Sequence, residues 1–210
     1  MTFPSVYEMF DPLTTVRKQR FLDWFSGSVL KEGWTFSYSA GNVSHQPNGI
    51  ADEIDGGWYI QTHNSNATAY IMIDHLNKYQ FNAVASAYIA VAKINSTSGI
   101  SFYVGLHEDS HFYTFIGSEN TYYKFSTRNN LIGSSSADTS VKMDTAWHVH
   151  KADTNGTVAN NYIDGVLEVT TSATLPTTAA GDLEPFIQIG NVSGGLSHRG
   201  SIRYMECWNT

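Results

Sequence analysis

Cysteine is nearly absent from this sequence of 210 residues, and the single one, Cys207, cannot form a disulfide within the chain. We expect it to be a buried, unreactive thiol, as structural cysteines usually are. Long apolar runs are also missing, because no stretch approaches the roughly 18 residues that a membrane-spanning helix needs. The sequence therefore excludes a disulfide scaffold and predicts no membrane span.

A signal peptide is not visible at the start of the chain. Residues 1–4, Met-Thr-Phe-Pro, lack the basic region and the apolar region that a secretory leader carries. Either the chain is not secreted by that route or its leader is not part of this sequence.

Positive charge is scarce. Lysine and arginine together number 12 against 19 aspartates and glutamates, which gives a formal net charge of −7. The chain thus has no overall basic field with which to hold phosphates, and we predict no nucleic-acid partner. Anionic polysaccharides are disfavoured on the same ground, unless a local patch overrides the mean.

Aromatic and small polar residues are plentiful. Hydrophobic residues make up 41% of the chain and aromatic residues 13%, while only 15% are charged, so the polar surface relies on Ser, Thr, Asn and Gly. This profile is typical of an antiparallel β protein with a sizeable core.

The first twenty residues differ from the rest. They contain two of the five prolines and the basic cluster Arg17, Lys18 and Arg20, and they show no period-two alternation. We predict an N-terminal arm or linker over residues 1–20 and one domain over residues 21–210. An arm of this kind that joins copies into a homo-oligomer is the sharper alternative.

The clearest strand pattern lies between Trp147 and Thr170. Two strands, Trp147–Ala152 and Ala159–Ile163, are joined by a turn centred on Asn155-Gly156, and a third strand, Val166–Thr170, follows the Asp164-Gly165 turn. Asn-Gly and Asp-Gly readily adopt the positive φ values of hairpin turns. A β-meander is therefore predicted.

Other segments also have strand patterns. Val84–Ile94 suits a central strand covered on both faces, Ser39–Asn48 reads as a polar loop, and the last strand is expected to pair with Phe21–Phe25. Further strands are predicted at Gly33–Tyr38, Trp58–Thr62, Ala67–Asp74, Ile100–Leu106, Phe112–Gly117, Thr121–Thr127, Leu183–Ile189 and Ser201–Trp208.

Alternation assigns the faces of the strands near the middle of the chain. The even positions of Ile100–Leu106 are apolar and should face the core, which leaves Ser101 and Tyr103 on the opposite face. Tyr123 and Phe125 should point inward by the same parity. A slip of one residue would exchange the two faces.

The Trp-His start, short hairpin and Ile163-Asp164-Gly165 of the meander resemble the middle of laminin-G-like and concanavalin A-like jelly-roll domains. The resemblance implies an all-β, two-sheet antiparallel jelly-roll sandwich. It also implies an extracellular or virion-surface location, since the group includes lectins, glycan-binding modules, glycosidases and virion proteins.

In such jelly rolls the outer side of the curved sheet holds glycans, which stack on aromatic rings and bond to polar groups. The alternative is that these rings cover the sheet or enter the core, and Trp58 fits a loop edge or the core equally well. The candidate ligand-binding residues are Tyr103, His107, His111, Tyr113, Tyr122 and Trp58.

The acidic residues Glu53 and Asp55 are weak catalytic candidates. Glu53-Ile54-Asp55 resembles the first part of the Glu-Ile-Asp-x-x-Glu strand of family-16 glycosidases, but Trp58 stands where that strand has its acid. A retaining mechanism needs two carboxyl groups about 5 Å apart across the scissile bond. A solvated turn is the competing interpretation.

His148 and His150 lie two residues apart, hence on one face of their strand. This spacing can chelate zinc, but no companion ligand motif is present. We expect both on a polar outer face, with Trp147 and Val149 inward. Calcium is left open by the laminin-G resemblance, and no other cofactor is predicted.

Three functions follow from these observations. The first is a non-catalytic carbohydrate-binding or adhesion module of a virion or cell surface. The second is a glycoside hydrolase related to the family-16 glucanases, with an incomplete Glu-Ile-Asp motif. The third is a purely structural capsid or fibre protein.

Overall fold

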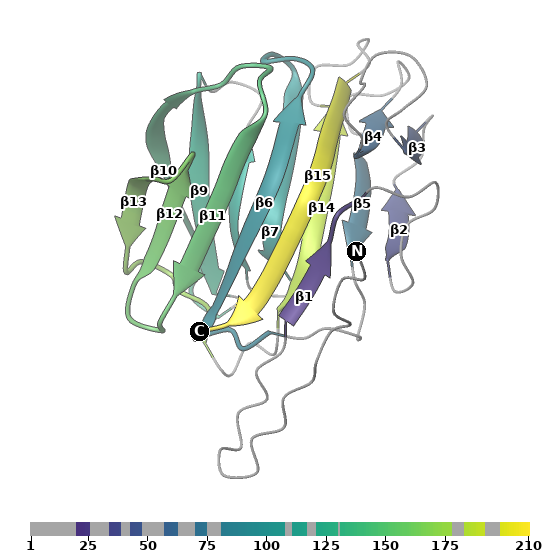
Figure 1. Cartoon of the computed structure of the whole chain (residues 1–210). Coiled ribbons are helices and arrows are strands. Elements are labelled where there is room, and N and C mark those ends of the chain that lie inside the picture. The colour runs from purple at the N-terminus through teal and green to yellow at the C-terminus, as the bar shows by residue number, and fades with distance from the viewer. Residues whose placement is uncertain are drawn as a thin grey trace.

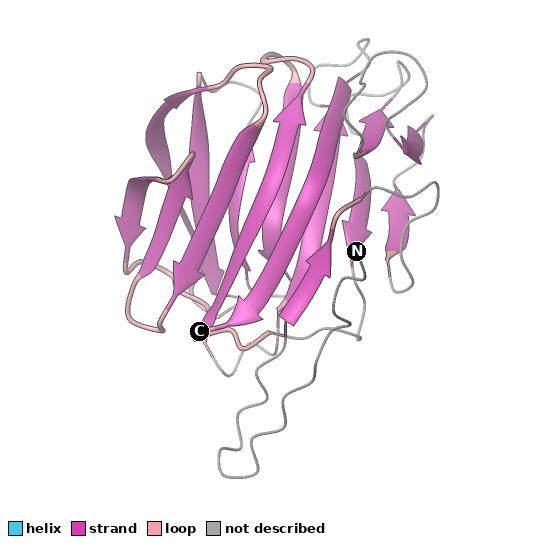
Figure 2. Ribbon diagram, in the orientation of Figure 1, coloured by secondary structure: helices cyan, strands magenta, loops and turns pink. Residues whose placement is uncertain are grey.

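The computed structural model describes residues 20–25, 34–38, 43–47, 57–62, 70–74, 81–107, 111–116, 121–129, 131–177, 183–191 and 198–210. Within these ranges the chain forms fifteen β-strands and no helix (Figure 2). The strands build two antiparallel sheets that pack face to face (Figure 1), which confirms the predicted jelly-roll sandwich. Across the same ranges, no helix has the length and apolar character needed to cross a membrane.

The first sheet has eight strands in the order β13-β12-β11-β6-β15-β4-β3, and β1 also pairs with β15. Its strands are β1 (Arg20–Asp23), β3 (Val43–Pro47), β4 (Trp58–Thr62), β6 (Ser86–Ile94), β11 (His148–Thr154), β12 (Ala159–Ile163), β13 (Val166–Thr171) and β15 (His198–Asn209).

The second sheet has seven strands in the order β10-β9-β8-β7-β14-β5-β2. Its strands are β2 (Thr35–Tyr38), β5 (Tyr70–Asp74), β7 (Ile100–His107), β8 (His111–Ile116), β9 (Tyr122–Asn129), β10 (Gly133–Lys142) and β14 (Glu184–Asn191).

The apolar core lies between the sheets, and period-two alternation supplies it. Phe102 and Val104 of β7 are buried while Tyr103 is half-buried, so the predicted parity of this strand is confirmed. Tyr123 and Phe125 of β9 also point inward as predicted. The parity leaves the odd-numbered side chains of β7 on the outer face of the seven-stranded sheet.

The two sheets approach closely where Phe102 packs over Gly200 of β15. A Cβ atom added at Gly200 would lie 2.4 Å from Cε2 of Phe102, which is closer than real Cβ contacts. Glycine is required here because its missing side chain lets the aromatic ring rest on the opposing backbone.

The predicted meander is present as β11, β12 and β13. Asp164 has φ of 51° and Gly165 has φ of 83°, as a tight turn with two positive φ values requires. The first connection is longer than a two-residue turn, since residues 155–158 all lie between the strands. Asn155 closes it by accepting hydrogen bonds from the backbone amides of Thr157 and Val158.

The two ends of the described chain meet, as predicted. β1 runs antiparallel to β15, and Phe21 pairs with Cys207, which is buried. Burial raises the pKa of the Cys207 thiol well above its ordinary value, consistent with an unreactive group. Asp23 anchors β1 because its carboxylate accepts hydrogen bonds from the Trp34 indole at 3.0 Å and the Phe25 amide at 2.9 Å.

The structure departs from the expected strands at three places. Residues 43–47 form β3 inside the segment predicted as a loop, and the ten residues of β10 had not been predicted as a strand. β6 is central, but only its inner face is fully covered, because Ile89 and Val91 on its outer side are half-buried. Both unpredicted strands are rich in polar residues, and neither shows the apolar alternation that marks a half-buried strand.

Candidate functional site

The candidate site is the outer face of the seven-stranded sheet, which we call the seven-stranded face. Among the described side chains, β7, β9 and β14 contribute to it. The outward residues are Ser101, Tyr103, Gly105 and His107 of β7, Tyr122, Lys124, Ser126 and Arg128 of β9, and Glu184, Phe186 and Gln188 of β14.

A ring stack lies near the middle of this face. The imidazole of His107 stacks on Phe186, with ring centroids 4.6 Å apart and an interplanar angle of 22°. In the backbone ladder Phe186 pairs with Gly105, so the position of β7 directly opposite this ring has no side chain. Phe186 is 2% exposed, which is unusual for an outward aromatic residue on the outer side of a sheet.

A buried carboxyl group accompanies the stack. Glu184 is 4% exposed, and in the ladder it pairs with His107. Burying a carboxylate is costly unless it is paired or hydrogen-bonded, so its position on this face needs a polar environment. The face therefore combines an acidic group, an imidazole and an aromatic ring within two strands.

Tyr103 lies two residues before Gly105 on the same face of β7, and it pairs with Gln188 of β14. Burial raises the pKa of Tyr103, so its hydroxyl stays protonated at neutral pH. The half-buried ring presents both an apolar surface and a hydrogen-bonding group.

The other candidate residues on this sheet lie on β8 and β9. In the backbone ladder, His111 pairs with His107 and Tyr113 pairs with Gly105, although their side chains are outside the described part. Tyr122 is half-buried and lies two strands away, at the start of β9. The strands thus bring Tyr103, His107, His111 and Tyr113 together, and Tyr122 lies farther along.

Trp58 does not join them. It is 5% exposed, belongs to the core, and begins β4 in the eight-stranded sheet. Of the two interpretations of Trp58, the core position holds, so it cannot offer its ring to a ligand at the seven-stranded face. Glu53 and Asp55 lie outside the described residues, as does the predicted arm apart from Arg20, the first residue of β1.

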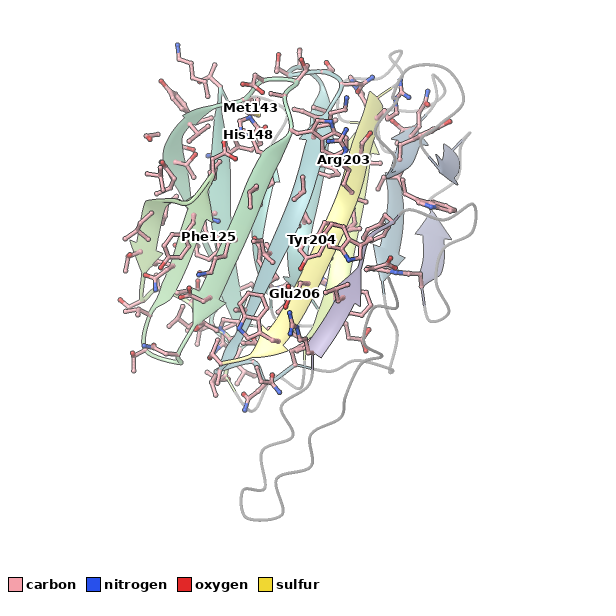
Figure 3. All side chains as sticks on the ribbon, viewed as in Figure 1. Phe125, Met143, His148, Arg203, Tyr204 and Glu206 are labelled. Atoms are coloured by element: carbon pink, nitrogen blue, oxygen red, sulfur yellow. The ribbon has the colours of Figure 1, made fainter. Side chains whose placement is uncertain are left out.

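His148 and His150 contradict their predicted orientation. Both point into the sandwich, where their rings lie 5.3 and 5.1 Å from that of Tyr123, while Trp147 and Val149 are half-buried on the outside. Figure 3 labels His148, which is the first residue of β11. Hydrophobicity favours the opposite arrangement, so polar partners must stabilise this one.

Two carboxylates provide those partners. Nδ1 of His148 lies 2.6 Å from Oδ2 of Asp164, and Nε2 lies 3.0 Å from Oδ1 of Asp144. The second oxygen of Asp164 accepts the Val149 amide at 2.9 Å. Ionised carboxylates only accept, so both bonds form together only when His148 is a cation with a proton on each nitrogen.

The titration behaviour follows from these contacts. Burial lowers the pKa of His148, but the hydrogen bonds and charges of Asp164 and Asp144 outweigh it and raise the pKa above 6.5. The Ala146 amide, more than any other contact, holds the pKa of Asp144 below its ordinary value. Burial lowers the pKa of His150 to about 3, so this second histidine is neutral.

The two histidines therefore have a structural role, because their rings pack on Tyr123 inside the sandwich. No group of three or more His, Cys, Asp or Glu side chains among the described residues is placed to hold a metal ion. Sequence reasoning missed Asp144 and Asp164 as partners, although the Asp-Gly turn marked Asp164. It also missed Glu184 and Phe186 as site residues, because Leu183–Ile189 carried only a strand signal.

The sequence matches no protein-family model and no curated protein sequence. The structure is similar to solved glucanases with sequence identities between 10% and 13%, so the likeness concerns the fold.

Three of these similar structures cover most of both chains. A pseudo β-1,3-glucanase of Mycobacterium tuberculosis matches with a TM-score of 0.67, 11% identity, and coverage of 90% of this chain and 98% of that one. The Bacillus licheniformis β-glucanase matches at 0.64, with 12% identity and 94% and 100% coverage. A GH16 protein from the Bacteroides ovatus mixed-linkage glucan system, solved with a product, matches at 0.66, with 12% identity and 88% and 98% coverage.

These neighbours support the glucanase side of the predicted resemblance. The laminin-G, lectin and virion sides of it stay predictions. The chain has the concanavalin A-like jelly-roll fold of the family-16 β-glucanases.

Proposed function

We propose that the protein is a glucan-directed relative of the family-16 glycoside hydrolases and that it holds its polysaccharide on the seven-stranded face. The observation that carries this proposal is the group formed by His107 stacked on Phe186, buried Glu184 and half-buried Tyr103. The fold supports it, since the similar Bacteroides ovatus protein was solved with a glucan product.

The chemistry of this group fits a neutral sugar chain. Pyranose rings present apolar C–H surfaces that stack on aromatic side chains, and hydroxyl groups that need fixed polar partners. Tyr103 offers both kinds of contact, His107 offers polar atoms, and Gly105 leaves space between them.

Binding is tested by calorimetry with laminarin and with mixed-linkage β-glucan. Replacing Tyr103 by alanine should weaken binding about tenfold or more, if its stacking on a sugar is worth as much as the roughly 1–3 kcal/mol that an aromatic side chain contributes under a nucleobase. The matched control is Tyr162→Ala, which removes a half-buried tyrosine from the eight-stranded sheet. Absence of glucan binding, or an equal loss in both variants, would refute the proposal.

Hydrolysis is the second candidate, and buried Glu184 favours it. A glycosidase needs a second carboxyl group across the scissile bond. Among the described side chains of β7, β9 and β14, Glu184 is the only carboxyl group. The similar Mycobacterium tuberculosis protein is itself a pseudo-glucanase, so this fold also occurs without glucanase activity.

A reducing-end assay with laminarin separates these outcomes. Turnover that is lost in Glu184→Gln would establish hydrolysis at the seven-stranded face, and turnover lost in Glu53→Gln would place it at the Glu-Ile-Asp motif. Binding without turnover would establish a non-catalytic carbohydrate-binding module. Silence in both assays would favour the purely structural role predicted from the sequence.

A further inference from the structure

The opposite side of the sandwich carries a second group of rings, each covered by cations. It lies on the outer face of the eight-stranded sheet, and Figure 3 labels Arg203 there, in the middle part of β15. We call this group the basic–aromatic patch, and it consists of Tyr59, Lys93, Trp147, Arg199 and Arg203.

Cations and rings are in direct contact across the patch. The guanidinium carbon of Arg203 lies 4.0 Å from the ring centroid of Trp147, and Nζ of Lys93 lies 5.1 Å from the same ring. The guanidinium of Arg199 lies 4.9 Å from the ring of Tyr59. All five side chains are half-buried.

A β-bulge puts Arg203 and its neighbour Tyr204 on the same outer face. Ile202 pairs with Ala92 and Tyr204 pairs with Val91, so Arg203 is an extra residue in β15. Alternation from Ser201 already directs Arg203 outward, and the bulge turns Tyr204 to the same face. Bulges are frequent beside functional sites. Without the bulge, Arg203 and Tyr204 would lie on opposite faces of the sheet.

The strand register sets the length of the patch. Tyr59 pairs with Ser201, and Ser201 pairs with Lys93, which stacks on Trp147. The row crosses three strand spacings and spans about 14 Å, at about 4.8 Å per spacing. An extended chain could contact both rings and all three cations along this row.

We propose that the basic–aromatic patch binds an acidic polysaccharide through its carboxylate or sulfate groups. A guanidinium stacked on a ring is held flat, and its edge can then form paired hydrogen bonds to a planar or tetrahedral anion. The rings offer apolar surface to the sugar units between these charges. The three cations form this surface on a chain whose net charge is −7.

A polysaccharide fits the patch better than a nucleic acid does. Duplex DNA carries one negative charge per about 1.7 Å of its axis and would extend far beyond a row of three cations onto an acidic protein. A uronate chain has lower charge density and presents sugar faces to the rings. This surface is separate from the seven-stranded face, so the inference does not depend on the proposed glucan site.

The test uses the full chain with dextran sulfate, polygalacturonate and uncharged dextran in affinity electrophoresis at low salt. One or both acidic polymers should retard the protein while dextran should not, and the responding polymer identifies sulfate or carboxylate as the ligand. The double variant Lys93→Gln/Arg203→Gln should weaken binding at least about tenfold, since hydrogen bonds to charged groups are lost.

The matched control removes two cations elsewhere. Lys142→Gln/Arg128→Gln changes the net charge equally but lies in β10 and β9 of the other sheet, so it should bind like the wild type. Arg199→Gln is the second variant if the first does not fold, and Trp147→Ala tests the ring without altering charge. Laminarin binding should be unchanged in the variants of Lys93, Arg203, Arg199 and Trp147, which all lie outside the seven-stranded face.

Three results would overturn the inference. The first is no retardation by either acidic polymer. The second is an equal loss in the patch variant and in the control, which would mean that only net charge matters. The third is equal affinity for a single-stranded oligonucleotide with the same sensitivity to Lys93→Gln/Arg203→Gln, which would show a general polyanion surface.

Discussion

The two outer faces of the sandwich hold their aromatic rings in different ways. On the seven-stranded face an imidazole stacks on Phe186 beside a buried carboxyl group, whereas on the eight-stranded sheet arginine and lysine cover Trp147 and Tyr59. The first arrangement suits neutral hydroxyl-bearing ligands, and the second suits anions. Outward positions are free of the packing constraints of the core, so one fold can carry two surfaces of different chemistry.

The eight-stranded sheet is not basic throughout. Farther along β15, Tyr204 and Arg20 both contact Glu206, and the exposed Trp24 packs on Tyr204 with ring centroids 4.6 Å apart (Figure 3). The carboxylate neutralises Arg20 there. The arginines that cover Trp147 and Tyr59 lie nearer the start of β15 than Glu206 does. A further cation, Lys151, covers Tyr162 on the neighbouring strands, with Nζ 4.7 Å from the ring centroid.

The largest expected effect on stability concerns the contact between Gly200 and Phe102, which joins the two sheets. Gly200→Ala should destabilise the fold by about 2 kcal/mol, because overpacking forces Phe102 and the sheets apart. Urea unfolding measures this loss, and both binding activities should decline together. Adding Phe102→Leu should recover part of the stability of Gly200→Ala, and strictly additive losses would show that the two residues do not clash.

A smaller effect on stability is expected at His148, which lies on the inner side of the sheet that carries the basic–aromatic patch. His148 has a raised pKa, so its stabilising contribution is fully present below pH 6.5 and is lost as the pH rises through the folded-state value. The lowered pKa values of Asp144 and Asp164 mean that the same contribution is lost at the acid end, as the pH falls through them from 3.8 downward.

His148→Gln should therefore cost of the order of 1 kcal/mol near pH 5–6 and less at pH 9. The measurement is the wild-type minus variant difference in unfolding free energy across this range. His150 and His198 have lowered pKa values and act in the opposite direction, since they destabilise the fold as the pH falls below 6.5. Both histidines are present in the wild type and in His148→Gln, so their contributions largely cancel in the difference in unfolding free energy between the two proteins. A difference that grows with pH would contradict the assignment, and Asp164→Asn should reproduce part of the loss.

The smallest effect is expected at the edge where the sheets meet. Glu168 of β13 accepts hydrogen bonds from the amide and hydroxyl of Ser140 in β10, at 2.8 and 2.7 Å. Glu168→Ala should cost about 0.5–1 kcal/mol and speed hydrogen exchange of the Ser140 amide. Glu168→Gln keeps an acceptor oxygen and should lie in between. Unchanged exchange would show that this edge is closed by other contacts.

Much of the fold could be predicted because turns and strand faces are indicated by patterns among residues that are close in sequence. The Asp164-Gly165 turn and the apolar even positions of β7 each indicate a local conformation or face, and both were confirmed. β3 and β10 gave no comparable signal, because their polar residues lack apolar alternation. Partner strands, rather than their own sequence, make these segments extended.

The candidate site was predictable only in part. Tyr103 and His107 could be placed on one face by parity, but the stack of His107 on Phe186 joins residues far apart in sequence. Trp58 was undecided between core and surface, and burial against the other sheet settled it. The bulge at Arg203 also left no recognisable mark, since it depends on the register of β15 against β6.

The sequence by itself determined that the chain forms antiparallel strands, where the meander turns, and which residues of β7 and β9 enter the core, because these features depend on neighbours along the chain. The tertiary structure decided which way the Trp147–His150 segment faces. Alternation offers two orientations, and the choice fell to the exposed carboxylates of Asp144 and Asp164, which bind the inward His148, and to the cations Lys93 and Arg203, which cover the outward Trp147. Asp144 and Asp164 are near in sequence, but Lys93 and Arg203 come from β6 and β15, so only folding brings the whole set together.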